Sequence, residues 1–200
     1  MKFIIASRKE VEYYAHTFAE LPHIIISITG SEESKLPINK SKGTKDILYL
    51  FFHDVDSAGQ LSKNPAERVL DEYNVFNDKQ AQEVIEFVEQ YKDQVEIVIC
   101  QCDAGISRSA GTAAALSKIY NGDDSVIFNN SAYMPNMRVY SALLNNYHSR
   151  LERFCKEFID DNQITCSEDI HFSNKLNLDP ALFVERICEI VGYHKDASVH

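Results

Sequence analysis

Four short hydrophobic segments alternate with amphipathic segments along the chain. Residues 3–6, 23–28, 46–52 and 95–100 are rich in β-branched, aromatic and other apolar side chains and are bounded by turn formers, which predicts four buried strands. The last segment is nearly all apolar, as is typical of a central parallel strand that is covered on both faces. These segments therefore predict one sheet with strand 95–100 in its interior.

Helical periodicity separates the predicted strands. Val11, Tyr14, Ala15 and Phe18 recur at the spacing of one helical face, which predicts a helix between the first two strands. An Ala-rich helix is predicted from about residue 109 to 120, where Asn121-Gly122 forms a suitable C-terminal cap. Further helix starts are predicted from capping residues and prolines at Asn64-Pro65, Asn77-Asp78, Pro135-Asn136 and Asp179-Pro180.

The alternation of strands and helices predicts the fold class. It indicates an α/β, three-layer fold with a mainly parallel sheet of about four strands flanked by helices. The periodic pattern weakens after residue 160, and the chain of 200 residues suits one domain with a short appendage. We therefore expect a domain over residues 1–159 and a C-terminal appendage over 160–200 with one amphipathic helix.

Composition narrows the choice of partners and location. Twenty Lys and Arg against thirty Asp and Glu give a net charge of −10, which disfavours nucleic-acid and anionic-membrane binding. The apolar runs are far shorter than the roughly 20 residues of a membrane span, and the N-terminal segment lacks the pattern of a signal peptide. Five cysteines without framework spacing predict free thiols, and hence a reducing, cytoplasmic location.

The segment after the last predicted strand carries the chemistry. It places Cys102 and Arg108 at the two ends of a loop that runs from an apolar strand into the Ala-rich helix, at the edge of the sheet where ligand crevices form. Backbone N–H groups of such a loop, together with the helix N-terminus, suit a phosphate. Arg108 can hold two phosphate oxygens at once. The predicted phosphate-binding residues are Asp103, Ala104, Gly105, Ile106, Ser107 and Arg108.

Cys102 is the candidate nucleophile of this loop. The positive helix end and Arg108 should favour its thiolate form, and the hydroxyl of Ser109 can donate a hydrogen bond to the sulfur. Gly105 allows whatever backbone conformation the tight loop requires. Cys100 lies two residues earlier on the same strand face, where we expect a packed core thiol rather than a partner for a protective disulfide. We expect the Asp103 side chain to face solvent.

These residues resemble the Cys-x5-Arg protein phosphatases, and among them the dual-specificity branch. Cys102, Gly105 and Ser107-Arg108-Ser109 match that branch's Cys-x-x-Gly-x-Ser-Arg-Ser signature. Pro135-Asn136 at the start of a helix, and a strand 46–52 that leads to Asp56-Ser57, match its flanking segments.

The resemblance implies a phosphatase that needs no metal or organic cofactor. It implies hydrolysis of phosphotyrosine, and more weakly of phosphoserine or phosphothreonine, in a phosphorylated protein or a small phosphomonoester. Asp56 is the favoured general acid. Asp54 is the alternative, because both residues have the same strand parity. Asn136 either orders the phosphate loop or only caps a helix.

Two departures from the family pattern keep other functions open. Gln101 stands where the family usually has His, and an apparent insertion occupies Ala58–Tyr73. Both favour a catalytically weak phosphate-binding module as an alternative. A rhodanese-like sulfurtransferase also places a Cys on a cradle loop, although Arg108-Ser109 suits phosphate better. The absence of lysine from the loop argues against phosphoinositides as substrates.

Overall fold

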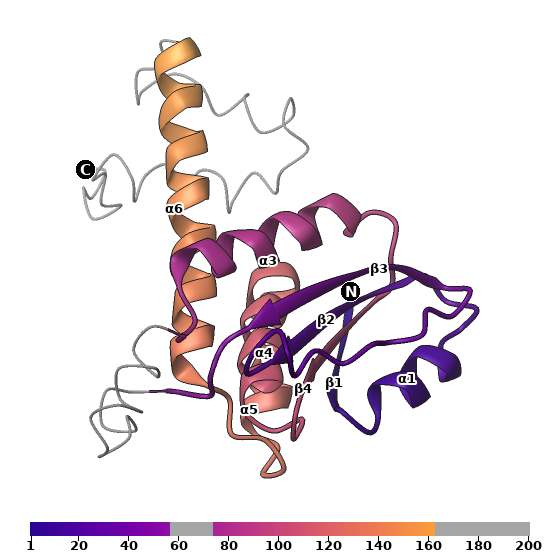
Figure 1. Ribbon diagram of the computed structural model, residues 1–200. Coiled ribbons are helices and arrows are strands. Elements are labelled where there is room, and N and C mark those ends of the chain that lie inside the picture. Colours follow the sequence, from indigo (N-terminus) through magenta and orange to yellow (C-terminus); the bar gives the residue numbers. More distant parts are fainter. Residues whose placement is uncertain (57–73, 163–200) are drawn as a thin grey trace, which may run out of the picture. The chain divides into compact units, whose positions relative to one another are not determined.

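The computed structural model describes residues 1–56 and 74–162. Within these residues the chain forms a four-stranded sheet in the order β1-β4-β2-β3, in which all neighbouring strands are parallel (Figure 1). The strands are β1 (Lys2–Ser7), β2 (His23–Thr29), β3 (Thr44–Phe51) and β4 (Ile97–Cys102). The parallel sheet predicted from the alternation of elements is confirmed.

Helices cover both faces of the sheet, so the predicted three-layer fold is confirmed as well. α3 and α4 pack on one face and α1 packs on the other (Figure 1). The helices among the described residues are α1 (Val11–Thr17), α3 (Asp78–Tyr91), α4 (Arg108–Asn121), the short α5 (Ser125–Phe128) and α6 (Met137–Asn162). Of these, α5 has no counterpart in the sequence-based prediction.

The interior strand β4 joins the two halves of the core. Its six residues are all buried. Val98, Cys100 and Cys102 face the core shared with α3 and α4, whereas Ile97 and Ile99 face the smaller core under α1. The strand is nearly all apolar because each of its faces packs against a separate layer of helices.

The predicted helix ends are recovered where the structure describes them. Asn77 caps α3 through a reciprocal capping box with Gln80. Gly122 ends α4 in the left-handed conformation, with φ of 75°. α6 begins directly after Pro135-Asn136. The predicted helix starts at Asn64 and Asp179 lie outside the described residues.

The chain divides into two compact units, Met1–Tyr147 and His148–His200. The first unit contains the sheet, and the described part of the second is the end of α6. The domain boundary at residue 159 stays a prediction. No described helix is long and apolar enough to cross a membrane.

Candidate active site

The loop between β4 and α4 lies at the carboxyl edge of the sheet. Its backbone is held through carbonyl groups: Asp103 O accepts from Arg8 N (3.2 Å), Ile106 O from Met134 N (3.0 Å) and Ser107 O from Asn136 N (3.1 Å). Among the described residues, no backbone hydrogen bond is donated by the N–H groups of 104–107. These donors are therefore available to a ligand, as expected of an anion-binding nest.

Gly105 is needed at the centre of this loop for two reasons. Its φ of 72° lies in the left-handed region, which side chains disfavour. A Cβ atom at this position would also lie 2.6 Å from the backbone nitrogen of Ser7, at the end of β1. The glycine therefore lets the loop pack directly against the turn between β1 and α1.

Cys102 ends β4 at the base of the loop. Its side chain is almost fully buried, and its Sγ lies 3.1 Å from the Oγ of Ser109, so the predicted contact between these two residues is present. Cys100 is buried in the core, and this burial, with a smaller contribution from Cys102, raises the pKa of the Cys100 thiol far above its usual range. Cys100 therefore remains protonated, as a packed core thiol does.

Arg108 reaches into the same loop from the first turn of α4. The residue is only 6% exposed. Its Nη1 donates to the carbonyl oxygen of Phe52 (2.9 Å) and its Nη2 to Oδ2 of Asp103 (2.7 Å). Its Nε is buried and has no hydrogen-bond partner among the described residues. A buried charged donor without a hydrogen bond is costly, and an oxyanion in the loop would supply the missing acceptor.

Asp103 is exposed, as expected from the sequence, but its carboxylate also joins an ion-pair network. Its side chain is 46% exposed, yet one carboxylate oxygen accepts from Arg108 and the other accepts from both Nε (3.1 Å) and Nη2 (2.9 Å) of Arg8. Partial burial works against ionisation here, but the hydrogen bonds from Arg108 and Arg8 outweigh it and hold the pKa of Asp103 below its usual range. The carboxylate therefore bridges two arginines from distant parts of the chain.

Asp54 follows β3 in the chain and lies beside the loop between β4 and α4. Its Oδ1 accepts from the hydroxyl of Ser107 (2.8 Å) and from Nδ2 of Asn136 (2.9 Å), and its Oδ2 is 3.8 Å from Nε of Arg108. Asn136 also accepts from the backbone nitrogen of Val139 (3.0 Å). Asn136 thus has both of the roles considered from the sequence, because it caps α6 and contacts the site.

Asp56 has different partners. Its Oδ1 accepts from the backbone nitrogens of Met137 (2.6 Å) and Arg138 (3.0 Å), at the start of α6. A carboxylate in that position favours the helix, because it satisfies N–H groups that have no partner within the helix. The structure therefore places Asp54 beside Arg108 and Asp56 at the N-terminus of α6, a difference that strand parity could not reveal.

Gln101 is fully buried in the sheet. The phosphatase family that the sequence resembles usually has His at this position. The Oε1 of Gln101 accepts from the hydroxyl of Ser27 (2.6 Å), and its Nε2 has no hydrogen-bond partner among the described residues. Strand alternation places this side chain on the opposite face of the sheet from Cys102. Among the described residues, Gln101 therefore forms a hydrogen bond with β2 and not with the phosphate loop.

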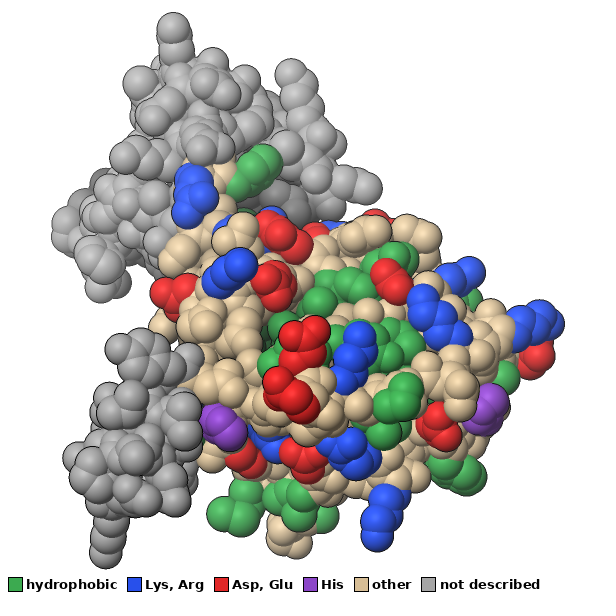
Figure 2. Space-filling view, viewed as in Figure 1, with side chains coloured by type: hydrophobic (Ala, Val, Ile, Leu, Met, Phe, Trp, Pro, Cys, Tyr) green, Lys and Arg blue, Asp and Glu red, His purple; other side chains and the backbone are tan. Residues whose placement is uncertain are grey.

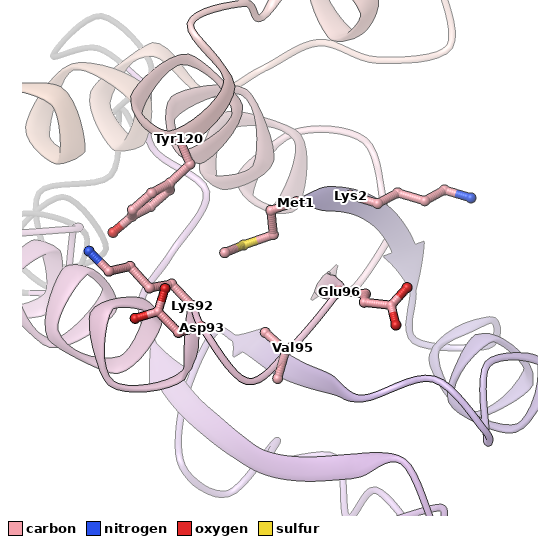
Figure 3. A pocket seen from close by; sticks show the side chains of 7 residues that line it. All are labelled: Met1, Lys2, Lys92, Asp93, Val95, Glu96 and Tyr120. Carbon is pink, nitrogen blue, oxygen red and sulfur yellow. The ribbon is translucent and has the colours of Figure 1, made fainter. Parts of the chain in front are cut away.

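A pocket of about 610 Å³ lies at the other edge of the sheet, where β1 and β4 begin (Figure 3). Its lining residues are Met1, Lys2, Lys92, Asp93, Val95, Glu96 and Tyr120. None of the residues predicted from the sequence to form a site lines this pocket. Among the described residues no group of three His, Cys, Asp or Glu side chains is arranged to hold a metal ion.

Comparisons with known proteins identify the fold. No family model matches the chain, and no curated protein matches it by sequence. The crystal structure of human DUSP28 does match, with a TM-score of 0.50 and 12% identity, over 76% of this chain and 94% of that chain. The chain has the fold of the dual-specificity phosphatases.

Other cysteine-based phosphatase structures match less closely. PTPMT1 is 18% identical over 78% of this chain and 95% of that chain, with a TM-score of 0.46. Tk-PTP in its active form is 12% identical over 72% of this chain and 90% of that chain, with a TM-score of 0.39. At these identities, the resemblance inferred from the sequence motifs is confirmed for the fold, and the activity has to be argued from the site.

Proposed function

We propose that the protein is a phosphomonoester hydrolase that acts on phosphotyrosine, and more weakly on phosphoserine or phosphothreonine, through a cysteinyl-phosphate intermediate. One observation carries this proposal: among the described residues the buried Nε of Arg108 has no hydrogen-bond partner, and it lies beside a loop whose N–H groups at 104–107 donate no hydrogen bond. Together these donors fit the oxygens of a phosphoryl group. The sulfur of Cys102 lies at the base of the same loop, 3.1 Å from Oγ of Ser109, and is the proposed nucleophile.

In the first step the Cys102 thiolate attacks phosphorus and a sulfur–phosphorus bond forms. The bond between phosphorus and the ester oxygen breaks, and that oxygen takes a proton from a carboxylic acid and leaves as an alcohol or phenol. Arg108 and the loop N–H groups hold the remaining phosphoryl oxygens, whose charge is spread over them in the transition state. Preorganised donors of this kind need no rearrangement during the reaction.

In the second step water attacks the cysteinyl phosphate. The carboxylate produced in the first step accepts a proton from that water, the sulfur–phosphorus bond breaks, and inorganic phosphate and the Cys102 thiolate are formed. The hydroxyl of Ser109, 3.1 Å from the sulfur, can donate a hydrogen bond to the departing thiolate. The cycle consumes one phosphomonoester and one water, and no cofactor takes part in either step.

Asp54 is the better supported source of the proton. Its Oδ2 lies near Nε of Arg108, where the phosphoryl group would bind, whereas Asp56 accepts two backbone hydrogen bonds from α6. Asp56 remains the alternative, as Asp-Ser after an apolar strand suggests. Because general-acid contacts often tighten only when substrate binds, the leaving-group test described in the Discussion decides between them.

The charge distribution favours a substrate with a single phosphoryl group. Acidic and basic side chains lie next to one another over much of the face in Figure 2 and do not form a large patch of one sign. At the loop itself, Asp103 and Asp54 accompany Arg108 and Arg8. A polyanionic headgroup or nucleic-acid end would meet these carboxylates, whereas a phosphoprotein presents one phosphate. We propose that such a protein is the partner, in the cytoplasm.

Hydrolysis assays test the proposal. p-Nitrophenyl phosphate, a phosphotyrosine peptide and a phosphoserine peptide are assayed side by side, with and without EDTA. We expect hydrolysis of the first two, weaker hydrolysis of the third and no effect of EDTA. Activity that EDTA abolishes, or no hydrolysis of any aryl phosphate, would contradict the proposal.

A second candidate function is a phosphopeptide-binding module with little turnover. It is favoured by Gln101, whose described hydrogen bond is to Ser27 on β2 and not to the phosphate loop. Tight binding of a phosphotyrosine peptide without measurable release of phosphate would support this candidate.

A further inference from the structure

Arg8 belongs to the turn between β1 and α1, and the Cys-x5-Arg motif does not include it. It nevertheless makes three contacts to Asp103: its backbone nitrogen donates to the carbonyl oxygen, and its Nε and Nη2 both donate to Oδ1. Its Nη2 also donates to the carbonyl oxygen of Ser34 (2.8 Å). The guanidinium is therefore fixed between two segments instead of extending into solvent.

Asp103 connects Arg8 to Arg108. Its second oxygen accepts from Nη2 of Arg108 at 2.7 Å, while the carbonyl oxygen of Phe52 holds Nη1. Two of the three nitrogens of the Arg108 guanidinium thus donate hydrogen bonds, and the third, Nε, has no hydrogen-bond partner among the described residues and lies 3.8 Å from Oδ2 of Asp54. The two hydrogen bonds keep the guanidinium from rotating and leave Nε available to an oxyanion.

We propose that Arg8 and Asp103 are positioning residues that hold Arg108 in its oxyanion-binding orientation. The proposal rests on the proposed function in taking an oxyanion as the ligand, but it concerns how the arginine is held rather than whether hydrolysis occurs. Neither side chain needs to touch the substrate. Their contribution is that Arg108 is ordered before the oxyanion arrives, so that binding does not have to order it.

The direction in which Asp103→Asn changes the affinity for phosphate distinguishes a positioning role from a through-space charge effect. Asp103→Asn removes a negative charge close to the phosphate site, so a through-space charge effect alone would make phosphate bind more tightly. If Asp103 positions Arg108, the same substitution weakens a charge-assisted hydrogen bond and phosphate binds less tightly. Charged hydrogen bonds are worth enough for a change of roughly tenfold in affinity, after allowance for the partial exposure of the Arg8–Asp103 pair.

The test measures the dissociation constant of inorganic phosphate by calorimetry for the full-length protein and its variants. We expect Asp103→Asn and Arg8→Ala each to weaken binding about tenfold. The double variant should be no weaker than Asp103→Asn alone, because Arg8 acts through Asp103. Lys9→Ala is the matched control: it removes the same charge from an exposed position in the same turn and should change the affinity little.

Several results would overturn the proposal. These are tighter or unchanged phosphate binding by Asp103→Asn, additive effects in the double variant, an equal effect of Lys9→Ala, or a wild-type protein that binds no phosphate. Arg8→Lys supplies a second check, since a lysine cannot reproduce the two side-chain contacts to Oδ1 and should restore only part of the affinity. Because binding is measured without turnover, normal phosphate binding with no hydrolysis would contradict the proposed function and leave the positioning role supported.

Discussion

The two edges of the sheet carry charged side chains in opposite ways. At the carboxyl edge Arg108 is buried, two of its guanidinium nitrogens donate hydrogen bonds, and Nε has no hydrogen-bond partner among the described residues. At the amino edge Lys92, which lines the pocket in Figure 3, pairs with Glu89 at 2.8 Å, and both side chains are partly exposed. Lys92 thus has a hydrogen-bonded carboxylate partner, whereas Nε of Arg108 has no hydrogen-bond partner among the described residues. This difference favours the loop over the pocket as the candidate site.

The largest expected effect comes from the sulfur at the carboxyl edge. Cys102→Ser should abolish turnover, because a hydroxyl is a far weaker nucleophile than a thiolate at neutral pH. Phosphate binding should persist, since the loop N–H groups and Arg108 remain. The measurements are steady-state hydrolysis of p-nitrophenyl phosphate and the phosphate dissociation constant.

Cys100→Ala provides the control for that experiment. Cys100 shares the strand face but is a protonated core thiol, so this variant should lose some stability and keep its activity. Undiminished hydrolysis by Cys102→Ser would contradict the mechanism at its first step.

The second prediction distinguishes Asp54 from Asp56. Asp54→Asn should slow hydrolysis of a phosphotyrosine peptide by about 10² to 10⁴, the usual contribution of general-acid catalysis. It should slow an aryl phosphate with a very acidic phenol much less, because that phenolate leaves without a proton. The limb of the pH–rate profile on which activity falls as the acid deprotonates should also disappear.

Asp56→Asn is the matched substitution. The amide keeps an oxygen that can accept from the N-terminus of α6, so both activity and melting temperature should change little. If Asp56→Asn shows the leaving-group dependence and Asp54→Asn does not, the assignment is reversed. If neither variant shows it, the phosphopeptide-binding module becomes the better supported function.

The third prediction concerns the unpaired nitrogen of Arg108. Arg108→Lys should lower kcat/KM by roughly 10² to 10³, the cost of removing a preorganised donor from an oxyanion site. Lys92→Arg at the amino edge makes the reverse exchange in a partly exposed ion pair and should leave kcat/KM unchanged. Near-normal kinetics of Arg108→Lys would mean that Arg108 serves packing and not the oxyanion.

Several features of the fold follow directly from local sequence. The cap at Asn77, the left-handed Gly122 and the apolar β4 each depend on a few neighbouring residues, and the structure confirms all three. The α5 helix was missed, since Ser125–Phe128 is a single turn too short for periodicity to detect.

The site was predictable only as far as its motif. The contact between Cys102 and Ser109 comes from one contiguous loop, so spacing alone suggests it. The Arg8–Asp103 pair joins residues 95 positions apart, and Asp56 meets Met137 across 81 positions. An arginine in a turn carries no sequence signal of so distant a partner, and equal strand parity gave Asp54 and Asp56 the same expected orientation. These relations depend on tertiary packing.

The smallest expected effects concern the pH dependence of stability, which should differ between the two edges of the sheet. Ion pairing holds the pKa of Asp103 below its usual range, so its stabilising contribution is present above pH ~4 and is lost as the pH falls through the folded-state pKa. The hydrogen bond from Lys92 to Glu89, although burial opposes it, raises the pKa of Lys92, so its contribution is present below pH ~10 and is lost as the pH rises further.

Thermal melts across the pH range measure both contributions. Each is worth no more than about 1 kcal/mol because the groups are partly exposed. Asp103→Asn should flatten the acid side of the stability profile and Lys92→Ala the alkaline side. If both variants changed the same side of the stability profile, the difference between the two edges would be contradicted.

Trapping the covalent intermediate tests the central claim most directly. The protein is mixed with an aryl phosphate, quenched in acid within the first turnovers, digested and analysed by mass spectrometry. The mechanism predicts one phosphoryl group on the peptide that contains Cys102, and none on that peptide in Cys102→Ser. A phosphoryl group on a peptide that lacks Cys102, or turnover with no phosphorylated peptide at any time, would contradict it.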